Sequence, residues 1–323
     1  MRLVFAGTPQ AALPSLEKLA ANFDVKAVLT RPPARQGRSK KLIKSPVHLL
    51  AESLNIEVIT QNPNTCEVKT KLQALNLDAI AVVAYGYILK KSILEVSKYG
   101  WFNLHFSLLP QFRGAAPVEN AIFYGCNKTG ITIFKIDEGM DTGQIACQKE
   151  YKLDSTETAG GLLDKLSRVG SKELLIFFQK LNKGKITFVK QQGKSSLAPK
   201  LDGVNSYINW ADTAVNISQK IRSFNPQPKA KTNLKLSNNK QLNLFILYAE
   251  QISNNNIPQF VKDYLLENNN LPVGSIISSK KRLFIKCGVG FLEVLQLQVE
   301  SRNVVGIRDF LNGFRIDKQA YFI

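Results

Sequence analysis

The chain has 323 residues, 44% of them hydrophobic and 21% charged, which is typical of folded globular proteins and excludes a disordered or fibrous chain. This length predicts two domains, and the absence of any run of about 18 apolar residues argues against a membrane span. The 43 Lys plus Arg against 25 Asp plus Glu give a net charge of +18, which fits a nucleic-acid partner and a merely basic protein equally well.

The first part of the chain alternates predicted strands with predicted helices. Short apolar, β-branched runs indicate strands, and apolar residues at three- and four-residue spacing indicate helices. The strand-like runs are residues 2–6, 25–30 and 78–84, and the helix-like stretches are 13–20, 47–54 and 159–181. This order predicts an α/β domain with a doubly wound, mostly parallel, Rossmann-like sheet.

A basic segment follows the second predicted strand. Residues 31–44 contain six basic side chains, one glycine and no acid. Such a segment can reach a phosphate backbone, although an isolated run of charge is more often a solvated surface. The six residues are Arg31, Arg35, Arg38, Lys40, Lys41 and Lys44.

One of the two histidines lies in the strand-like run 101–106. On an extended strand Asn103 and His105 share a face, so an amide and an imidazole would point into one space. In parallel α/β sheets ligands bind beyond the carboxyl ends of the strands, where residues 107–110 should lie. The alternative is a core histidine beside a turn asparagine.

A second element near the centre of the chain carries two acids. Residues 129–143 join an alternating strand to a tight loop with Asp137 and Asp141, and with glycines at 139 and 143. A carboxylate on such a loop could orient His105 and adjust its pKa, as general acid–base catalysis requires. We expect Asp137 to have a structural role in the loop. Taken alone, this pattern is also that of an ordinary turn.

The composition and the hydrophobic pattern of the sequence change after residue 188. Residues 189–206 are polar and rich in turn formers, so we predict a linker between a domain at 1–188 and one at 207–323. The second part has one helix-like stretch, 213–223, and several short strand-like runs, which predict a small β-barrel or sandwich. From residue 190 onward 18 Lys plus Arg face 9 Asp plus Glu, a net charge of +9. The strand-like runs are 243–248, 274–277, 283–287 and 291–299.

The four cysteines argue against a metal or redox motif, and the start of the chain argues against a secretion signal. Cys66, Cys126, Cys147 and Cys287 lack the close spacing of a metal or redox motif, so we expect buried free thiols and no metal. The start reads as a strand entering a loop, without the pattern of a secretion signal. A cytoplasmic protein is expected.

Taken together, the motifs resemble those of the formyltransferase family that uses 10-formyltetrahydrofolate. The central part reads Asn103-x-His105-x-Ser107-Leu108-Leu109-Pro110, then residues 112–117 (FRGAAP), 129–132 (TGIT) and 137–143 (DEGMDTG). Further segments are similar to the members that act on methionyl-tRNA. These are residues 4–9 (VFAGTP), 37–41 (GRSKK), 45–47 (SPV) and 221–226 (IRSFNP).

The resemblance implies a reaction and its residues. Asn103, His105 and Asp141 match the catalytic trio of the family, and Ser107, Leu108, Leu109 and Pro110 match its folate-contacting segment. The implied reaction moves a formyl group from 10-formyltetrahydrofolate to the amine of methionine on initiator tRNA. Asn103 and protonated His105 would stabilise the oxyanion, while Asp141 would hold the imidazole.

The resemblance also gives the basic segment a partner. It implies that this segment contacts the acceptor stem of the tRNA. We expect Arg38 to be the main contact, with Arg35, Lys40 and Lys41 as further contacts. The C-terminal domain would be an OB-like barrel that anchors the tRNA through phosphate contacts, which position a nucleic acid without reading its sequence. A monomer is expected.

The sequence leaves three rival functions to consider. A formyltransferase for a sugar nucleotide or a purine-precursor amine would need the same trio but not the two basic surfaces. A hydrolase would release formate from the same carrier. A non-enzymatic RNA-binding protein is disfavoured because all three candidate catalytic residues are present.

Overall fold

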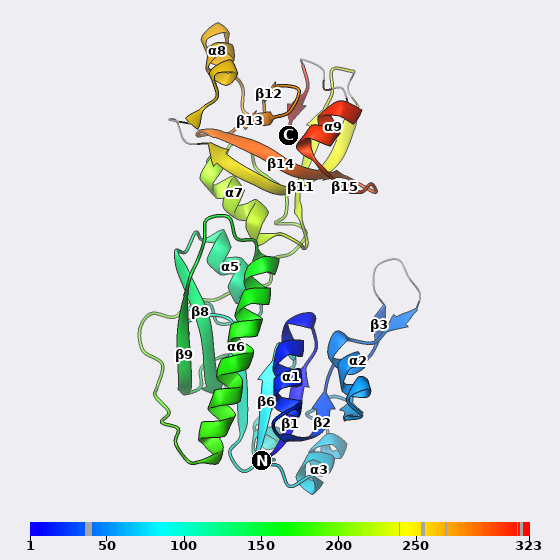
Figure 1. The fold of residues 1–323 in the computed structure, drawn as a ribbon, viewed down its shortest axis with the longest axis vertical. Coiled ribbons are helices and arrows are strands. Elements are labelled where there is room, and N and C mark those ends of the chain that lie inside the picture. The colour runs from blue at the N-terminus through cyan, green and yellow to red at the C-terminus, as the bar shows by residue number, and fades with distance from the viewer. Residues whose placement is uncertain (36–40, 239, 253–255, 269, 315, 317–318) are drawn as a thin grey trace. The chain divides into compact units, whose positions relative to one another are not determined.

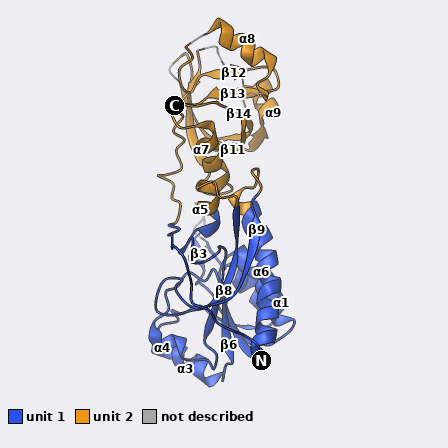
Figure 2. Cartoon of the chain, turned by 90° about the vertical axis from the view of Figure 1, so that its left-hand side faces the viewer, with its two compact units in different colours: residues 1–118, 128–153, 161–199 blue, residues 119–127, 154–160, 200–323 orange. Residues whose placement is uncertain are grey.

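The computed structural model describes the whole chain except residues 36–40, 239, 253–255, 269, 315 and 317–318. The chain forms two compact units (Figure 2). The first consists of residues 1–118, 128–153 and 161–199, and the second of residues 119–127, 154–160 and 200–323. Within the described residues, no helix is both long enough and apolar enough to cross a membrane.

The first unit is built on a seven-stranded sheet with the order β5-β2-β1-β6-β7-β8-β9 (Figure 1). The strands from β5 to β7 pair in parallel, whereas β8 and β9 are antiparallel additions. The mostly parallel, Rossmann-like sheet is therefore confirmed. Its strands are β1 (Arg2–Gly7), β2 (Asp24–Leu29), β5 (Glu57–Ile59), β6 (Ala79–Val83), β7 (Trp101–His105), β8 (Lys128–Lys135) and β9 (Ile145–Lys152).

Helices cover both faces of this sheet: α1 and α6 lie on one side, and α3 and α4 on the other (Figure 2). Phe102 of β7 packs against Phe177 and Phe178 of α6, with ring centroids 4.9 and 6.0 Å apart. Burial on both faces explains why the central strands read as continuous apolar runs. The helices of this unit are η1 (Gln10–Ala12), α1 (Leu13–Ala20), α2 (Pro46–Ser53), α3 (Cys66–Ala74), α4 (Lys91–Leu94) and α6 (Ala159–Asn182), whereas most of α5 (Pro117–Phe123) belongs to the second unit.

The second unit is an antiparallel sheet with the order β12-β13-β14-β11-β10-β16, and β15 pairs with β14. The two ends of this order meet, because Phe322 N donates to Gly274 O at 2.9 Å. The predicted barrel-like domain is confirmed. Its elements are α7 (Ala214–Ser223), β10 (Ala230–Lys235), β11 (Gln241–Ile252), α8 (Gln259–Glu267), β12 (Ile276–Ser278), β13 (Leu283–Lys286), β14 (Phe291–Val299), β15 (Val304–Gly306), α9 (Ile307–Gly313) and β16 (Tyr321–Phe322).

One strand of the second unit and the burial of the cysteines differ from expectation. Strand β10 was not predicted, because Ala230 and Thr232 are weak apolar markers on its buried face, between lysines on the other. All four cysteines are free, but only Cys287 is buried, and burial raises the pKa of its thiol to about 12. Cys66 is exposed at the start of α3, so the expectation of four buried thiols was wrong.

Candidate active site

A pocket of about 660 Å³ lies at the carboxyl ends of β6 and β7 in the first unit. Ligands of parallel α/β sheets bind at this edge. One wall is the loop that follows β6, and the opposite wall is the loop that follows β8. The lining residues are Val82, residues 84–89, residues 103–106, Gly114, Ala115, Pro117, Phe134 and residues 136–141.

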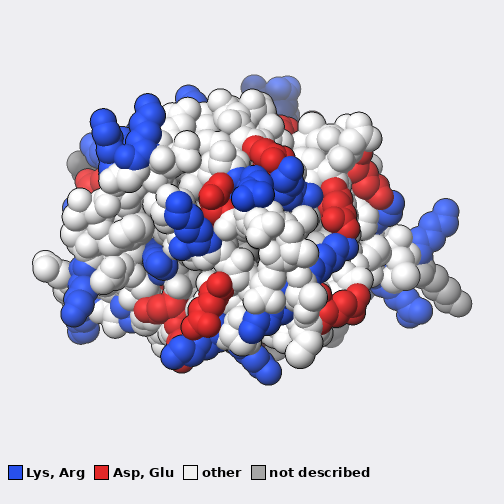
Figure 3. Space-filling view, turned by 90° about the horizontal axis from the view of Figure 1, so that it is seen from below, with Lys and Arg blue, Asp and Glu red and all other residues white. Residues whose placement is uncertain are grey.

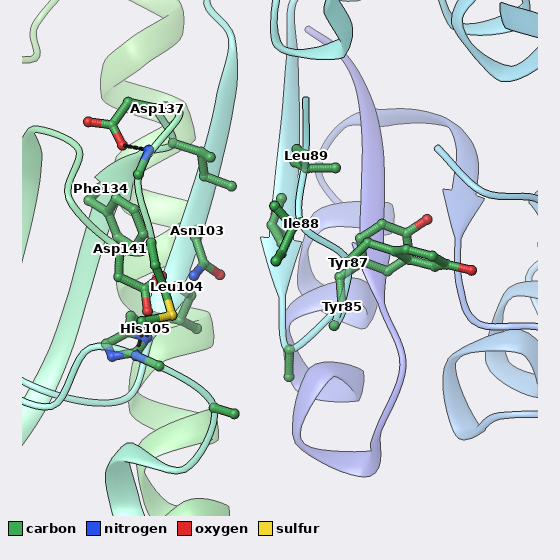
Figure 4. Close-up of a pocket in the computed structure, with 18 of the residues that line it drawn as sticks. Tyr85, Tyr87, Ile88, Leu89, Asn103, Leu104, His105, Phe134, Asp137 and Asp141 are labelled. Atoms are coloured by element: carbon green, nitrogen blue, oxygen red, sulfur yellow. Dashed lines mark hydrogen bonds and ion pairs between the residues drawn. The ribbon is translucent and has the colours of Figure 1, made fainter. Parts of the chain in front are cut away.

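Asn103 and His105 lie side by side in this pocket, as the alternation along β7 predicts (Figure 4). The Asn103 side-chain oxygen is buried and has no hydrogen-bond partner among the described residues. Buried polar atoms are rarely left unpaired, so this oxygen marks a position open to a ligand. His105 is only 6% exposed.

The hydrogen bonds of His105 define which ring nitrogen can take up a proton. Its Nε2 lies 2.9 Å from the carbonyl oxygen of Phe112. A carbonyl oxygen can only accept, so Nε2 carries a hydrogen and Nδ1 is the free base of the neutral ring. Nδ1 lies 3.8 Å from a carboxylate oxygen of Asp141, which is ion-pair range but too long for a hydrogen bond. Protonation at Nδ1 would therefore place a cation beside that carboxylate.

Asp141 reaches the site from the loop after β8. Its carboxylate accepts a hydrogen bond of 2.8 Å from Gly114 N, which fixes the oxygen that faces His105. Its backbone has a φ of +53°, in the left-handed region that L-residues rarely adopt. Such local strain is found where a fold holds a functional group in place.

The rest of this loop explains its two acids and its glycines. Asp137 accepts hydrogen bonds from Gly139 N at 3.1 Å and from the Thr142 hydroxyl at 2.6 Å, so it organises the loop from within. A Cβ on Gly143 would overlap with the carbonyl oxygen of Lys135. Position 143 therefore requires glycine, because the loop approaches β8 closely there. The two acids differ in their partners: Asp137 bonds within its own loop, whereas Asp141 bonds to Gly114.

The opposite wall, residues 84–89, was missed by the sequence reasoning. Three contacts hold its backbone: Thr8 Oγ1 donates to Tyr85 O at 3.2 Å, Arg31 Nη2 to Gly86 O at 2.5 Å, and Asn64 Nδ2 to Ile88 O at 2.9 Å. The Arg31 guanidinium also lies over the Tyr87 ring, 3.8 Å from its centroid. The available signal was the place of this loop directly after a buried strand.

Comparison with known proteins shows the family to which the chain belongs. Residues 1–176 match the family model described as formyl transferase, and residues 200–315 match its C-terminal domain. The chain belongs to the formyl transferase family. It is similar over its whole length to proteins named methionyl-tRNA formyltransferase, and each match covers 99% of both chains. The identity is 36% to the Bifidobacterium longum protein and 35% to that of Rickettsia massiliae.

Solved formyl transferases share the fold. A methionyl-tRNA formyltransferase from Clostridium thermocellum superposes with a TM-score of 0.53 at 21% identity, over 78% of this chain and 94% of that one. The sugar 3N-formyl transferase WlaRD, solved in the presence of 5-N-formyl-THF, gives a TM-score of 0.63 at 20% identity, over 94% of this chain and 99% of that one.

Four predicted folate-contacting residues of this formyl transferase do not line the pocket. Ser107, Leu108, Leu109 and Pro110 instead form a turn tied to β8 and β9. Thr132 Oγ1 donates to Ser107 O at 2.6 Å, and Gln148 Nε2 donates to Leu109 O at 2.7 Å. These bonds fix the chain just after His105, and contact of the four residues with the folate stays a prediction.

The basic segment of the formyl transferase is described only in part. Strands β3 (Ala34–Arg35) and β4 (Leu42–Ile43) pair as an antiparallel hairpin base, on which Arg35 is exposed. Lys41 is exposed just before β4, whereas Arg38 and Lys40 lie outside the described residues. The face shown in Figure 3 has basic and acidic side chains interspersed. Net charge alone therefore does not locate a binding surface.

The site offers acid–base and hydrogen-bonding chemistry. It combines an amide with an open oxygen, an imidazole with a free Nδ1 and an oriented carboxylate. Over the part of the chain that the structure describes, no three His, Cys, Asp or Glu side chains are grouped to hold a metal ion.

Proposed function

We propose that this protein transfers the formyl group of 10-formyltetrahydrofolate to the α-amino group of methionine on initiator tRNA. The observation that carries the proposal is the convergence of Asn103, His105 and Asp141 at one pocket, in a chain related over its full length to methionyl-tRNA formyltransferases. We assign the three residues as catalytic. The product would be formylmethionyl-tRNA, with which translation starts.

The pocket fits the formyl donor in size and in chemistry. Its volume of about 660 Å³ is within the range of small-molecule sites, and its walls include Tyr87, Ile88 and Leu89, which suit flat aromatic rings. The open Asn103 oxygen offers a hydrogen-bond acceptor at the reacting end. A fold relative was solved with a formylated folate, which supports the same class of donor here.

Asn103 and His105 divide the work of the transfer. As the amine nitrogen bonds to the formyl carbon, negative charge develops on the formyl oxygen, and the Asn103 amide can donate a hydrogen bond to it. His105 starts neutral: its Nδ1 accepts the proton that the attacking amine loses, and the resulting imidazolium, stabilised by the Asp141 carboxylate, is the protonated form that can help to stabilise the oxyanion. The same proton then goes to the folate nitrogen as its bond to the formyl carbon breaks. The products are formylmethionyl-tRNA and tetrahydrofolate, so atoms and charge balance.

The tRNA would be held by basic surfaces. The segment 31–44 carries six basic residues, and the chain from residue 190 onward has a net charge of +9. Lys and Arg contacts to phosphates provide much of the affinity for nucleic acid and make it fall with salt. We assign Arg38, Arg35, Lys40 and Lys41 to the tRNA. A monomeric chain in the cytoplasm stays a prediction.

The deciding experiment compares acceptors. Labelled formyl on 10-formyltetrahydrofolate is supplied with methionine-charged initiator tRNA, free methionine or an amino-sugar nucleotide. Transfer to the charged tRNA alone is expected. Transfer to the sugar nucleotide would keep the catalytic trio but contradict the assignment of the basic surfaces, and release of formate in the absence of an amine would indicate a hydrolase.

Arg38→Ala is expected to raise the KM for charged tRNA about tenfold, because one phosphate contact is lost. The slope of log kcat/KM against log salt should become less steep by about one. Steady-state kinetics at several salt concentrations measure both. Lys183→Ala, at an exposed lysine just after α6, serves as the charge-matched control. An unchanged KM and salt slope in the Arg38 variant would remove Arg38 from the interface.

Arg31→Ala is expected to raise the KM for the formyl donor about tenfold, because the pocket wall loses a charged hydrogen bond and a cation–π contact. Turnover at saturating donor should stay within about threefold of the parent, since His105 is untouched. The matched control is Lys98→Ala, which removes a cation 4.9 Å from the Tyr99 ring, away from the pocket. Equal KM values for the two variants would contradict this role of the wall.

A further inference from the structure

Residues 189–198 pack along the edge of the active site, although their composition is that of a linker. At one end Val189 and Ile145, the first residue of β9, exchange backbone hydrogen bonds of 2.8 and 2.9 Å. At the other end Ala198 N donates to Arg113 O at 2.7 Å, and Arg113 N donates to Ser196 O at 2.9 Å. The segment thus connects the start of β9 with the loop that precedes α5.

Gln191 is the residue of this segment that reaches the site. Its Nε2 donates to the carbonyl oxygens of Asp141, at 2.8 Å, and of Gly143, at 2.9 Å. Its Oε1 accepts from Arg113 Nη2 at 2.6 Å and Nε at 3.3 Å. Both donor hydrogens and both acceptor positions of the amide are therefore used, which is the full capacity of a glutamine.

These bonds hold Asp141 from two sides. The Nε2 bonds fix the backbone of Asp141, which is in the left-handed conformation that non-glycine residues rarely adopt. The bonds to Arg113 fix the residue before Gly114, and Gly114 N donates to the Asp141 carboxylate. A displacement of about 1 Å at a reacting group can cost about a hundredfold in rate, so this support has functional weight.

We propose that Gln191 is a positioning residue that keeps the Asp141 carboxylate beside His105. It does so by clamping the loop after β8 to Arg113. The inference rests on the proposed catalytic role of Asp141, and it gives residues 189–198 a part in the active site.

Two substitutions test the clamp. Gln191→Met keeps the size of the side chain and removes all four hydrogen bonds, whereas Gln191→Glu keeps an acceptor for Arg113 and removes the two donors. Both should lower kcat about 10- to 100-fold, with the KM values for donor and tRNA within about threefold. Gln192→Glu is the matched control, because Gln192 is the next residue, is exposed and has no hydrogen bond among the described residues. Parent-like turnover in Gln191→Met would overturn the proposal.

A double-mutant cycle separates positioning from general damage to the fold. If Gln191 acts through Asp141, Gln191→Met in an Asp141→Asn background should lower kcat by less than about threefold further. A loss in that background equal to the loss in the parent would mean that Gln191 acts elsewhere, and would overturn the proposal.

Amide hydrogen exchange of the ligand-free protein distinguishes failure of this inference from failure of the proposed function. Peptides that cover residues 137–144 should exchange faster in Gln191→Met than in the parent and in Gln192→Glu. If exchange is faster in Gln191→Met but the parent protein transfers no formyl group, the positioning role of Gln191 is supported and the proposed function is contradicted. Equal exchange would overturn the clamp even if transfer occurs.

Discussion

Replacing His105 with alanine is expected to lower the turnover of formyl transfer about a thousandfold. The imidazole Nδ1, 3.8 Å from the Asp141 carboxylate, is the proposed proton acceptor, and alanine removes it together with the Nε2 contact to Phe112 O. Single-turnover transfer from 10-formyltetrahydrofolate to charged initiator tRNA measures the chemical step directly. Binding of the tRNA, measured separately, should stay within about threefold of the parent, because the lost group acts on the reaction.

The second histidine gives a matched control for this variant. His48 is 9% exposed in α2, outside the pocket, with its Nε2 3.3 Å from Glu52. His48→Gln should retain turnover within about threefold, since exchanges away from the reacting groups change rate little. If His105→Ala kept a tenth or more of the parent turnover, or lost tRNA binding in parallel, His105 would be a structural residue.

Replacing Asn103 with alanine is expected to lower turnover about 100- to 1,000-fold, as loss of one oxyanion donor does in other acyl-transfer sites. The same variant should not be less stable. The Asn103 side-chain oxygen is buried without a partner among the described residues, so its removal takes away an unsatisfied polar group. The free energy of unfolding of the ligand-free protein is therefore expected to be equal to that of the parent or higher.

Asn103→Asp sharpens this prediction. The carboxylate has nearly the same shape as the amide but no hydrogen to donate, and it would repel the negative charge that develops on the formyl oxygen. Turnover should be at least as low as in the alanine variant. Denaturant unfolding and single-turnover assays on both variants measure the two effects. High turnover in Asn103→Asp would mean that the residue does not donate to the oxyanion.

The three residues proposed as catalytic show how much a local sequence pattern can predict. Asn103 and His105 could be placed together because a strand repeats every two residues, and this repeat is fixed by the backbone alone. The pattern of residues 129–143 could connect a loop carboxylate with His105, but only the family resemblance singled out Asp141 as that residue. Its distance of 3.8 Å from His105 arises because the loop after β8 folds back over β7, a path that depends on contacts distant in sequence.

Gln191 shows where composition alone does not predict the role of a residue. Gln191 lies in a polar stretch that predicts a linker, but polar side chains can bond to a distant loop as well as to water, and composition does not distinguish the two. For the turn that begins at Ser107, the folate contact that the family resemblance implies stays a prediction. In the structure the turn at residues 107–110 is bound to β8 and β9 and does not line the pocket.

The alternation of strands and helices in the first domain, the barrel-like second domain and the pair of side chains on β7 could all be predicted from the amino-acid sequence. These depend on the periodicity of apolar residues, which local backbone geometry imposes. Three features became visible only in the folded protein: the loops that form the pocket walls, the free ring nitrogen of His105, and the hydrogen bond from Gln191 to the backbone of Asp141. Those outcomes depend on hydrogen bonds between residues up to 78 positions apart, and no local pattern encodes such partners.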